Sequence, residues 1–498
     1  MNLTTKPWIP IVLENGKPDM VSLTEAFSRG YEIRDLAVRP HERIALMRLL
    51  ICVTQAALDG PADYDDWKTC QSRITPRALK YLEQWQHAFE LFGSGQRFLQ
   101  IGNLKKLKDD DEGNPVSKLD LALATGNNPT LFDNAGGSKR ELSTAQLALN
   151  LLTFQCFSPG GRIGVALWND KETTGKGSSD HAPCIAGSML HALVRGRNLL
   201  ETIHINLLSR SQVVQLYGEG RWGRPLWEQM PDDPAKGDSV RNATDTYLGR
   251  LVPLSRAVLL NKHSDTMVLA NGLKFAPYPQ WREPTATVVI RQTKGQSERV
   301  LLRASLDRAP WRELHSLTVK TLSQASLGGP VALQNIPDNQ AFDLWVGGLV
   351  ADQAKLVDTL ESVFHVPAAM LTDPGQRTYE AGVKHAEAIE VRLRRAVSVY
   401  HKELGDNLDR AEMREQRQRV QSKAAFQFWT EVERRVNDLL DIAANPKVLG
   451  LEKAWHKTAW GQAVWRAALA AFDRACPHET ARQIRAYALG RKRLNDET

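Results

Sequence analysis

The sequence predicts an α+β protein, with a large mixed α/β N-terminal domain followed by a C-terminal four-helix bundle. Three observations carry this prediction. The chain has 498 residues, which is too long for one ordinary hydrophobic core. Strand and helix patterns are mixed up to about residue 360, and long helical patterns dominate after Pro367. We therefore expect one domain at residues 1–366 and a second at 367–498.

Local patterns predict the N-terminal elements. Runs rich in β-branched and apolar residues predict strands at 7–12, 285–292 and 299–304. The four residues 293–296, which include Gly295, are typical of a hairpin turn between the last two strands. Helix-like spacing of apolar residues predicts helices at 40–57 and 143–157. Ser143 has the residue type and position of an N-cap for the second helix.

The last quarter of the chain has helical periodicity throughout. It predicts four helices, at 378–403, 409–443, 451–475 and 478–493. Asn445-Pro446 and Cys476-Pro477 separate the last three. Short connections favour an antiparallel bundle. Residues 375–498 hold 23 Lys and Arg against 17 Asp and Glu, a net charge of +6. This bias suits a polyanionic partner, although a solvated surface of mixed charge fits the same count.

Composition narrows the class of protein. Hydrophobic residues make up 42% and charged residues 24%, which is normal for a globular chain. No apolar run approaches the roughly 18 residues that span a membrane, and the N-terminus lacks the apolar stretch of a signal peptide. The cysteines are scattered and form no CxxC pair, which indicates a reducing, cytoplasmic setting without a disulfide framework. They are Cys52, Cys70, Cys156, Cys184 and Cys476.

Two glycine-containing loops flank the predicted helix at 143–157. They cover residues 126–137 and 158–164. Glycine lacks a Cβ, so the backbone of such a loop approaches a partner closely. A rigid helix would hold the two loops at a fixed separation, as binding loops are commonly held. Two plain connectors fit the same pattern, and spacing alone leaves both interpretations open.

Several motifs, taken in order, resemble a known family. They are Pro7–Ile11, Phe132–Asn134, Ser158–Gly161, Ser179–Cys184, Trp345–Gly348 and Asp352–Ala354. Together they resemble the CasA family, the large subunits of type I-E Cascade complexes in CRISPR immunity, over nearly the whole chain. The resemblance implies a non-catalytic subunit that reads the PAM, the short motif beside the DNA target, and starts duplex opening. It implies guide RNA, the other Cascade subunits, target duplex DNA and a separate helicase-nuclease as partners, with no cofactor and no membrane.

The resemblance also implies a DNA-binding set. Its members are Gly160, Gly161, Arg162, Gly164, Lys262, Asp352 and Gln353. The glycine loop would enter the minor groove, and Gln353 would act as a wedge that unstacks one base step. A family lysine also contacts the PAM; neither Lys262 nor Lys274 aligns cleanly, and we favour Lys262. A helix C-terminal stop is the alternative for the loop, and a surface helical glutamine is the alternative for Gln353.

The loop at 126–137 carries the docking residues that the resemblance implies. Phe132, Asp133 and Asn134 would hold the subunit on the 5′ handle of the guide RNA, with the phenyl ring stacking on a base. The family usually has an apolar residue where Asp133 stands. A carboxylate would repel phosphate, so we expect Asp133 to point at protein. Burial of Phe132 in the core is the alternative.

Two other classes of function remain open. A hydrolase would use Cys184 as nucleophile and His181 as its base, although no oxyanion-hole motif accompanies them. A helical scaffold would make no nucleic-acid contact. Some CasA relatives carry a cysteine cluster in mid-chain, but residues 251–265 hold no cysteine, so no metal is expected. Residues 175–179 lack the spacing of an NTPase phosphate loop.

Overall fold

The computed structural model describes most of the chain. The described residues are 1–108, 113–123, 141–161, 163–175, 181–234, 237–262, 265–293, 295–320, 327–352, 355–405, 411–446 and 454–496. Internal contacts divide the chain into two compact units. The first consists of Met1–Pro310, Lys320–Pro337 and Phe342–His365; the second consists of Trp311–Val319, Asp338–Ala341 and Val366–Thr498. The predicted domain limits at 366 and 367 stay a prediction.

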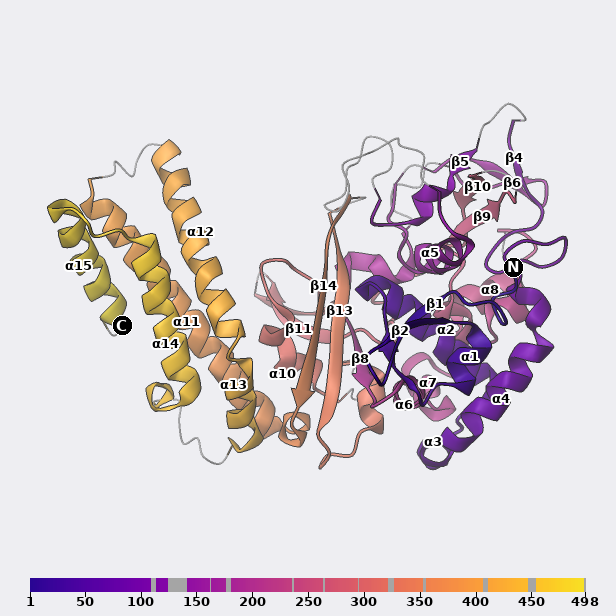
Figure 1. The fold of residues 1–498 in the computed structure, drawn as a ribbon, viewed down its shortest axis with the longest axis horizontal. Coiled ribbons are helices and arrows are strands. Elements are labelled where there is room, and N and C mark those ends of the chain that lie inside the picture. The colour runs from indigo at the N-terminus through magenta and orange to yellow at the C-terminus, as the bar shows by residue number, and fades with distance from the viewer. Residues whose placement is uncertain are drawn as a thin grey trace. The chain divides into compact units, whose positions relative to one another are not determined.

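The strands of the first unit form several small sheets (Figure 1). One sheet has the strand order β2 (Pro18–Val21), β1 (Ile9–Leu13), β3 (Ile33–Leu36). A second has the order β4 (Leu104–Lys106), β6 (Ala166–Trp168), β7 (Lys171–Glu172). A third has the order β5 (Asn114–Pro115), β10 (Thr266–Asn271), β9 (Arg256–Leu260). Two further sheets are β11 (Val288–Thr293) with β12 (Gln296–Leu301), and β14 (Lys355–Val366), β13 (Phe342–Asp352), β8 (His191–Arg195).

Helices fill the space around these sheets. They are α1 (Leu23–Ser28), α2 (Pro40–Leu58), α3 (Tyr64–Thr69), α4 (Gln71–Gln84), α5 (Thr144–Phe157), α6 (Leu199–Ile205), α7 (Arg210–Tyr217), α8 (Asp238–Asp245) and α9 (Tyr247–Leu251). Helices α2 and α5 pack against each other and are buried along almost their whole length. A helix that is apolar on all sides belongs in a core, so these two form the centre of the unit.

Most of the predicted N-terminal elements are confirmed. Helices α2 and α5 match the predictions within one residue at each end. Strand β1 lies at the first predicted strand, and the predicted hairpin is β11–β12, with Thr293 opposite Gln296. The third strand was misplaced: it spans 296–301, not 299–304, because the tight turn begins pairing directly after Gly295.

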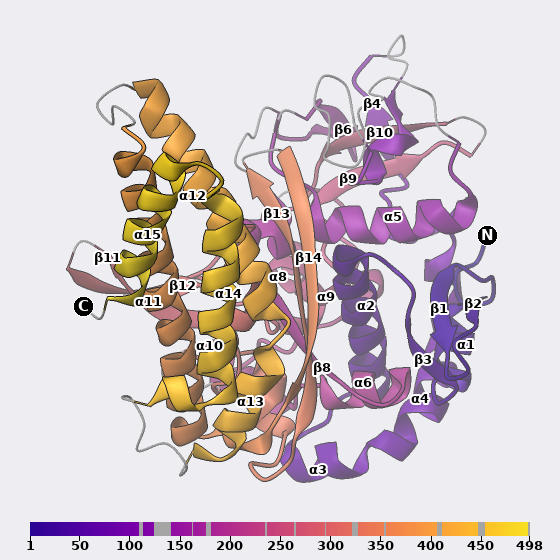
Figure 2. The ribbon, with the colours of Figure 1, turned by 60° about the vertical axis from the view of Figure 1, so that its left-hand side comes forward.

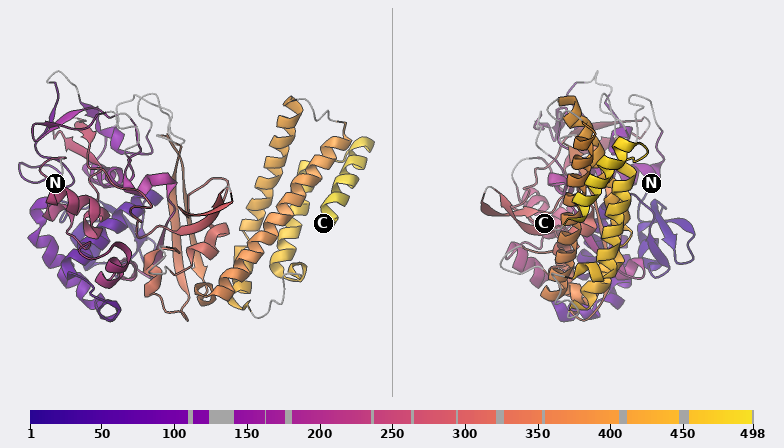
Figure 3. Two further views of the ribbon diagram at one scale, coloured as in Figure 1. Left: turned by 180° about the vertical axis from the view of Figure 1, so that it is seen from behind. Right: turned by 90° about the vertical axis from the view of Figure 1, so that its left-hand side faces the viewer.

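The second unit is a helical bundle. It contains α10 (Leu314–Leu317), α11 (Asp373–Glu403), α12 (Ala411–Glu433), α13 (Val436–Ala444), α14 (Ala459–Ala475) and α15 (Ala481–Asn495). The long helix α11 packs against α12, α14 and α15 (Figures 2 and 3). The mixed α/β first unit and this bundle confirm the predicted fold class.

Two helix predictions in the bundle were wrong in detail. The helix predicted at 409–443 is interrupted at Arg434–Arg435, after which α13 buries Leu439 against the glycine face of α11 at Gly382. No Gly or Pro marks this break, so tertiary packing produces it. The helix predicted from residue 451 begins at Ala459, where the Thr458 side chain caps it by accepting from the Gly461 N–H. No described helix is long and apolar enough to cross a membrane.

Candidate nucleic-acid interface

Helix α5 is a rigid mount for the glycine loop. Ser143 caps it as predicted: its Oγ accepts from the Gln146 N–H at 3.2 Å, and the Gln146 side chain accepts from the Ser143 N–H at 2.9 Å. This reciprocal pair satisfies two donors at the helix start. The helix then runs through the core to Phe157, so its C-terminal end has little freedom to move.

Buried hydrogen bonds fix the start of the glycine loop. Ser158 is fully buried, and its Oγ lies 3.3 Å from the Oγ of Ser255. The guanidinium of Arg256, also buried, donates to the Pro159 carbonyl at 2.8 Å. The Ala182 N–H donates to the Ser158 carbonyl at 3.0 Å. Strand β9 thus holds the loop at the point where it leaves the helix.

The glycines beyond this anchor are only partly covered by the rest of the protein. Gly160 and Gly161 are half-buried and Gly164 is exposed. Gly161 has φ +141°, a conformation that favours glycine. A Cβ on Gly164 would lie 4.0 Å from the Leu269 carbonyl, its nearest neighbour, so the core leaves room for a side chain there. Arg162 lies outside the described residues.

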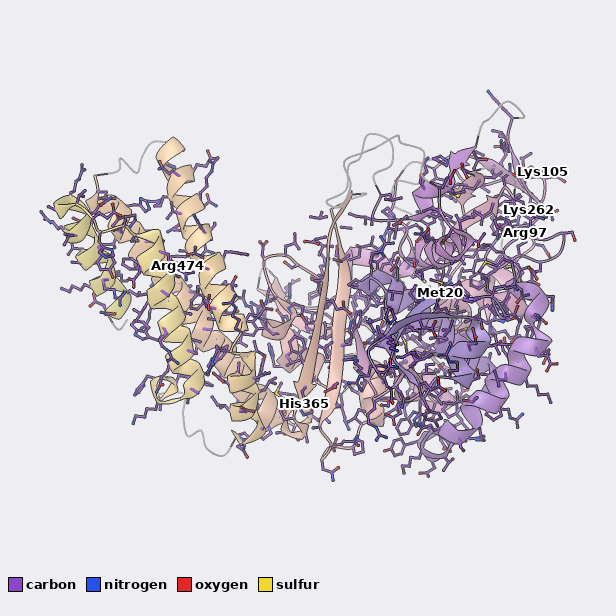
Figure 4. All side chains as sticks on the ribbon, viewed as in Figure 1. Met20, Arg97, Lys105, Lys262, His365 and Arg474 are labelled. Carbon is purple, nitrogen blue, oxygen red and sulfur yellow. The ribbon has the colours of Figure 1, made fainter. Side chains whose placement is uncertain are left out.

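The hairpin β9–β10 carries both candidate lysines at different ends. Lys274 follows the stretch in which Gly272 and Leu273 pair with Ser255 and Leu254, at the anchor of the glycine loop. Exposed Lys262 follows the other end of β9, six residues from Arg256, or roughly 20 Å of extended chain. Figure 4 places Lys262 near Arg97, which donates to the Leu260 carbonyl. The role of Lys262 stays a prediction, and strand pairing brings Lys274, although farther along the chain, closer to the anchor of the glycine loop.

The predicted wedge position lies between two long strands. Strand β13 ends at Asp352 and β14 begins at Lys355, and the two-residue separation requires antiparallel pairing. The residues on both sides are therefore strand, not the surface helix that was the alternative. Gln353 itself lies outside the described residues, as does the side chain of Asp352.

Close packing positions the end of β13. The Oγ of Ser188 donates to the Ala351 carbonyl at 3.1 Å and accepts from the Ala351 N–H at 3.0 Å. A Cβ on Gly348 would meet the Met189 carbonyl at 3.0 Å, and one on Gly347 would strike the Trp345 ring. The two glycines thus let β13 approach its neighbours, and Ser188 fixes the backbone directly before Asp352.

The docking residues Phe132, Asp133 and Asn134 lie outside the described residues.

The structure argues against the hydrolase alternative, because Cys184 is not placed to act as a nucleophile. Cys184 is fully buried, and burial raises the pKa of its thiol well above the usual value, so the nucleophilic thiolate is suppressed. Its carbonyl accepts from the buried His191, whose other ring nitrogen bonds to Thr285 Oγ1 at 2.7 Å. Cys184 is therefore part of a packed turn. Within the described residues no three His, Cys, Asp or Glu side chains are grouped to hold a metal ion.

Sequence reasoning missed the residues that position the loop and the hairpin. Ser255 and Arg256 lie 97 residues after the loop residues that they bond, and Ser188 lies 163 residues before Ala351. In the sequence Ser255 and Arg256 directly precede an apolar run, but their hydrogen-bond partners follow only from the fold.

The fold and the anchored loop beside a hairpin define a protein of the CRISPR-associated Cse1 class. Residues 2–471 match the model of the family described as CRISPR-associated protein Cse1, and the chain belongs to this family, the CasA proteins of type I-E Cascade. The resemblance seen in the sequence is thereby confirmed.

Individual relatives agree with this assignment. The CRISPR-associated protein CasA/Cse1 of Thermus thermophilus is 30% identical over 408 residues, 78% of this chain and 75% of that protein. The structure of Thermus thermophilus CasA (Cse1) has a TM-score of 0.72 at 24% identity and covers 99% of both chains. Cse1 from Acidimicrobium ferrooxidans has a TM-score of 0.74 at 19% identity, covering 99% of this chain and 96% of its own. A chain of a CRISPR RNA-guided surveillance complex has a TM-score of 0.72 at 18% identity, covering 100% and 99%.

Proposed function

We propose that this chain is the non-catalytic large subunit of an RNA-guided CRISPR surveillance complex in the cytoplasm. It recognises the PAM in target duplex DNA, promotes duplex opening and R-loop formation, and helps to recruit a separate helicase-nuclease. The observation that carries the proposal is the glycine loop, which Ser255 and Arg256 anchor, and in which Gly160 and Gly161 are half-buried and Gly164 is exposed. The likeness to a chain of a CRISPR RNA-guided surveillance complex supports the assembly.

An anchored glycine loop suits minor-groove readout. The groove is narrow, so a backbone without side chains enters where bulky residues do not fit. The minor groove mainly distinguishes A·T from G·C pairs, which predicts a relaxed PAM. Because α5 and Arg256 fix the start of the loop at Ser158 and Pro159, less conformational entropy is lost there when DNA binds.

Duplex opening would begin at the β13–β14 hairpin. Gln353 follows β13, whose end Ser188 fixes, and Asp352 precedes it. Unstacking one base step costs a few kcal/mol, and an amide both donates and accepts hydrogen bonds, so it replaces part of what the bases lose. The guide RNA then pairs with one strand, in an exchange of nearly balanced free energy that needs no nucleotide hydrolysis. Phe132, Asp133 and Asn134 would dock the subunit on the guide RNA handle.

The glycine loop gives the test. Gly160→Leu places a side chain where the loop would enter the groove, and Gly95→Leu is the matched control because open space surrounds a Cβ there. Complexes with each variant are assembled on guide RNA and titrated with duplexes that differ only in the PAM. We expect Gly160→Leu to assemble but to lose PAM-dependent binding, and Gly95→Leu to behave as wild type. Wild-type PAM ranking and affinity in Gly160→Leu would show that the loop is only a connector.

The same titration at two salt concentrations distinguishes cationic residues that contact phosphates from those that read bases. Arg162→Ala should weaken all duplexes about equally and lower the salt slope by about one, as expected for a phosphate contact. Lys262→Ala and Lys274→Ala are compared in parallel, and the lysine whose loss changes the PAM ranking is the one that reads bases. A complex lacking this chain that binds every duplex like the full complex would favour the scaffold alternative.

A further inference from the structure

Positive charge is concentrated where α15 packs on the C-terminal part of α11. Residues 391–405 and 481–495 together hold nine Lys and Arg and one acidic residue, Glu403, a net charge of +8. The whole chain carries +7, so the remaining 468 residues together carry −1. The net positive charge of the protein is thus a local property of this helix pair.

The packing of the two helices defines this region. They run antiparallel and lie side by side (Figure 2). A Cβ on Gly490 of α15 would lie 3.0 Å from the Ala396 carbonyl of α11, and Arg482 donates to the Leu404 carbonyl. In this register residues 481–495 lie along 405–391. Buried Ala486, Gly490 and Leu494 form the contact face of α15, so its opposite side faces outward.

Six basic side chains on this surface make no ion pair within the described part of the chain. They are Arg392, Arg395, Lys402, Arg485, Lys492 and Arg493, and we call them the α11–α15 basic face. Four of them are exposed and the other two are half-buried. Elsewhere on the bundle some exposed cations pair with a carboxylate one turn away, as Arg377 does with Asp373 and Lys384 with Glu380. Other exposed cations stand singly on their helices, whereas the basic face gathers six cations on two adjacent helical segments that hold only one acidic residue.

We propose that the α11–α15 basic face binds the phosphate backbone of duplex DNA without sequence preference. This site is separate from the glycine loop and does not depend on the PAM-reading proposal. Helix α15 is about 22 Å long, which matches roughly six base pairs of backbone. Surfaces for single strands use exposed aromatic side chains for stacking. On α11 and α15, Tyr379 and Tyr400 are buried, and Tyr487 donates to Asp473.

The test removes charge from the face and, separately, from paired positions. The face variant is Arg395→Gln/Arg485→Gln/Lys492→Gln in the full chain. The control variant is Arg377→Gln/Lys384→Gln/Arg419→Gln, which removes the same net charge from residues paired with Asp373, Glu380 and Glu415. Binding to a PAM-free duplex of about 20 base pairs is measured between 50 and 200 mM salt. Circular dichroism confirms that both variants are folded.

We expect the face variant to bind on the order of 100-fold more weakly at low salt. It should also lower the salt slope by about three, because each phosphate that is no longer neutralised reduces the slope by about 0.9. The control should change the slope by less than one. In the assembled complex the face variant should keep the wild-type PAM ranking, so this result is independent of the glycine-loop test.

Four outcomes would overturn the proposal. Unchanged duplex binding by the face variant excludes the contact. Equal losses in both variants indicate overall charge instead of this face. Equally tight binding of a single strand of the same length, with the same loss in the face variant, excludes a duplex-specific surface. A face variant that binds duplex normally but no longer joins the complex shows that the face meets an acidic protein, for which exposed Ile484 and Leu489 would supply apolar contacts.

Discussion

Glu283 lies between two arginines in the core of the first unit, and all three side chains are almost fully buried. Its carboxylate accepts from Arg48 at 2.8 Å and from Arg250 at 2.9 Å. Other guanidinium nitrogens of the two arginines donate to backbone carbonyls, among them those of Leu251 and Thr244. Burial opposes ionisation, but the two arginines lower the pKa of Glu283 to about 2. One carboxylate thus compensates two buried cations.

Glu283→Gln should destabilise the first unit by about 3–5 kcal/mol, because it leaves two buried guanidinium groups without a counter-charge. Urea unfolding at pH 7 measures the loss. Glu32→Gln, at a largely exposed carboxylate, is the control and should change stability by less than about 1 kcal/mol. Since the folded pKa of Glu283 is depressed, its contribution is present above pH 4.5 and is lost as pH falls toward 2. An unchanged midpoint in Glu283→Gln would contradict the network's role.

Elements with local signals could be predicted from the sequence. Helix α5 has a capping serine at its start, and the hairpin β11–β12 has a glycine turn between β-branched runs. Strands β13 and β14 were not predicted, although the motif at Gly347–Gly348 was noticed, because those glycines serve tertiary packing against Trp345 and Met189. The candidate site shows the same difference. The glycine loop could be recognised from local sequence, whereas its anchor at Arg256 depends on tertiary packing.

At the end of β13, Ser188→Ala should loosen the strand without unfolding the unit. It removes two hydrogen bonds to the backbone of Ala351, each contributing about 1 kcal/mol. Hydrogen exchange of a peptide covering β13 should be faster, and that of one covering α5 should not change. Equal protection of β13 in both proteins would show that Ser188 does not hold this end.

In the bundle, the contact between α11 and α15 depends on Gly490. A Cβ there would lie 2.7 Å from the Phe472 ring and 3.0 Å from the Ala396 carbonyl. Gly490→Leu should therefore destabilise the second unit by about 1–3 kcal/mol. Ala488→Leu, at an exposed position on the same helix, is the control and should be nearly neutral. Similar urea midpoints for the two variants would contradict this packing.

For the whole molecule, histidines couple stability to pH in both units. Burial lowers the pKa of His41 to about 3 and those of His191 and His385 to about 4. Each stays neutral in the folded chain while the unfolded chain takes up a proton below pH 6.5. Stability should therefore fall as pH decreases from 6.5 toward 4, by about 1.4 kcal/mol per pH unit for each of His41 and His191 and by less for the half-buried His385.

His41 isolates one histidine's part of this dependence. Its ring packs edge-on to Phe157 with centroids 6.2 Å apart, and neither ring nitrogen has a hydrogen-bond partner among the described residues. His41→Phe keeps an aromatic ring and removes two unsatisfied polar atoms, so stability at pH 7 should be equal or slightly higher. Between pH 6.5 and 4.5 the first unit's unfolding free energy should fall less steeply than in wild type, by about 1.4 kcal/mol per pH unit. Urea titrations at pH 7, 6, 5 and 4.5 measure both effects. The same slope in variant and wild type would mean that His41 takes up its proton in the folded protein, and therefore that the core around α2 admits water.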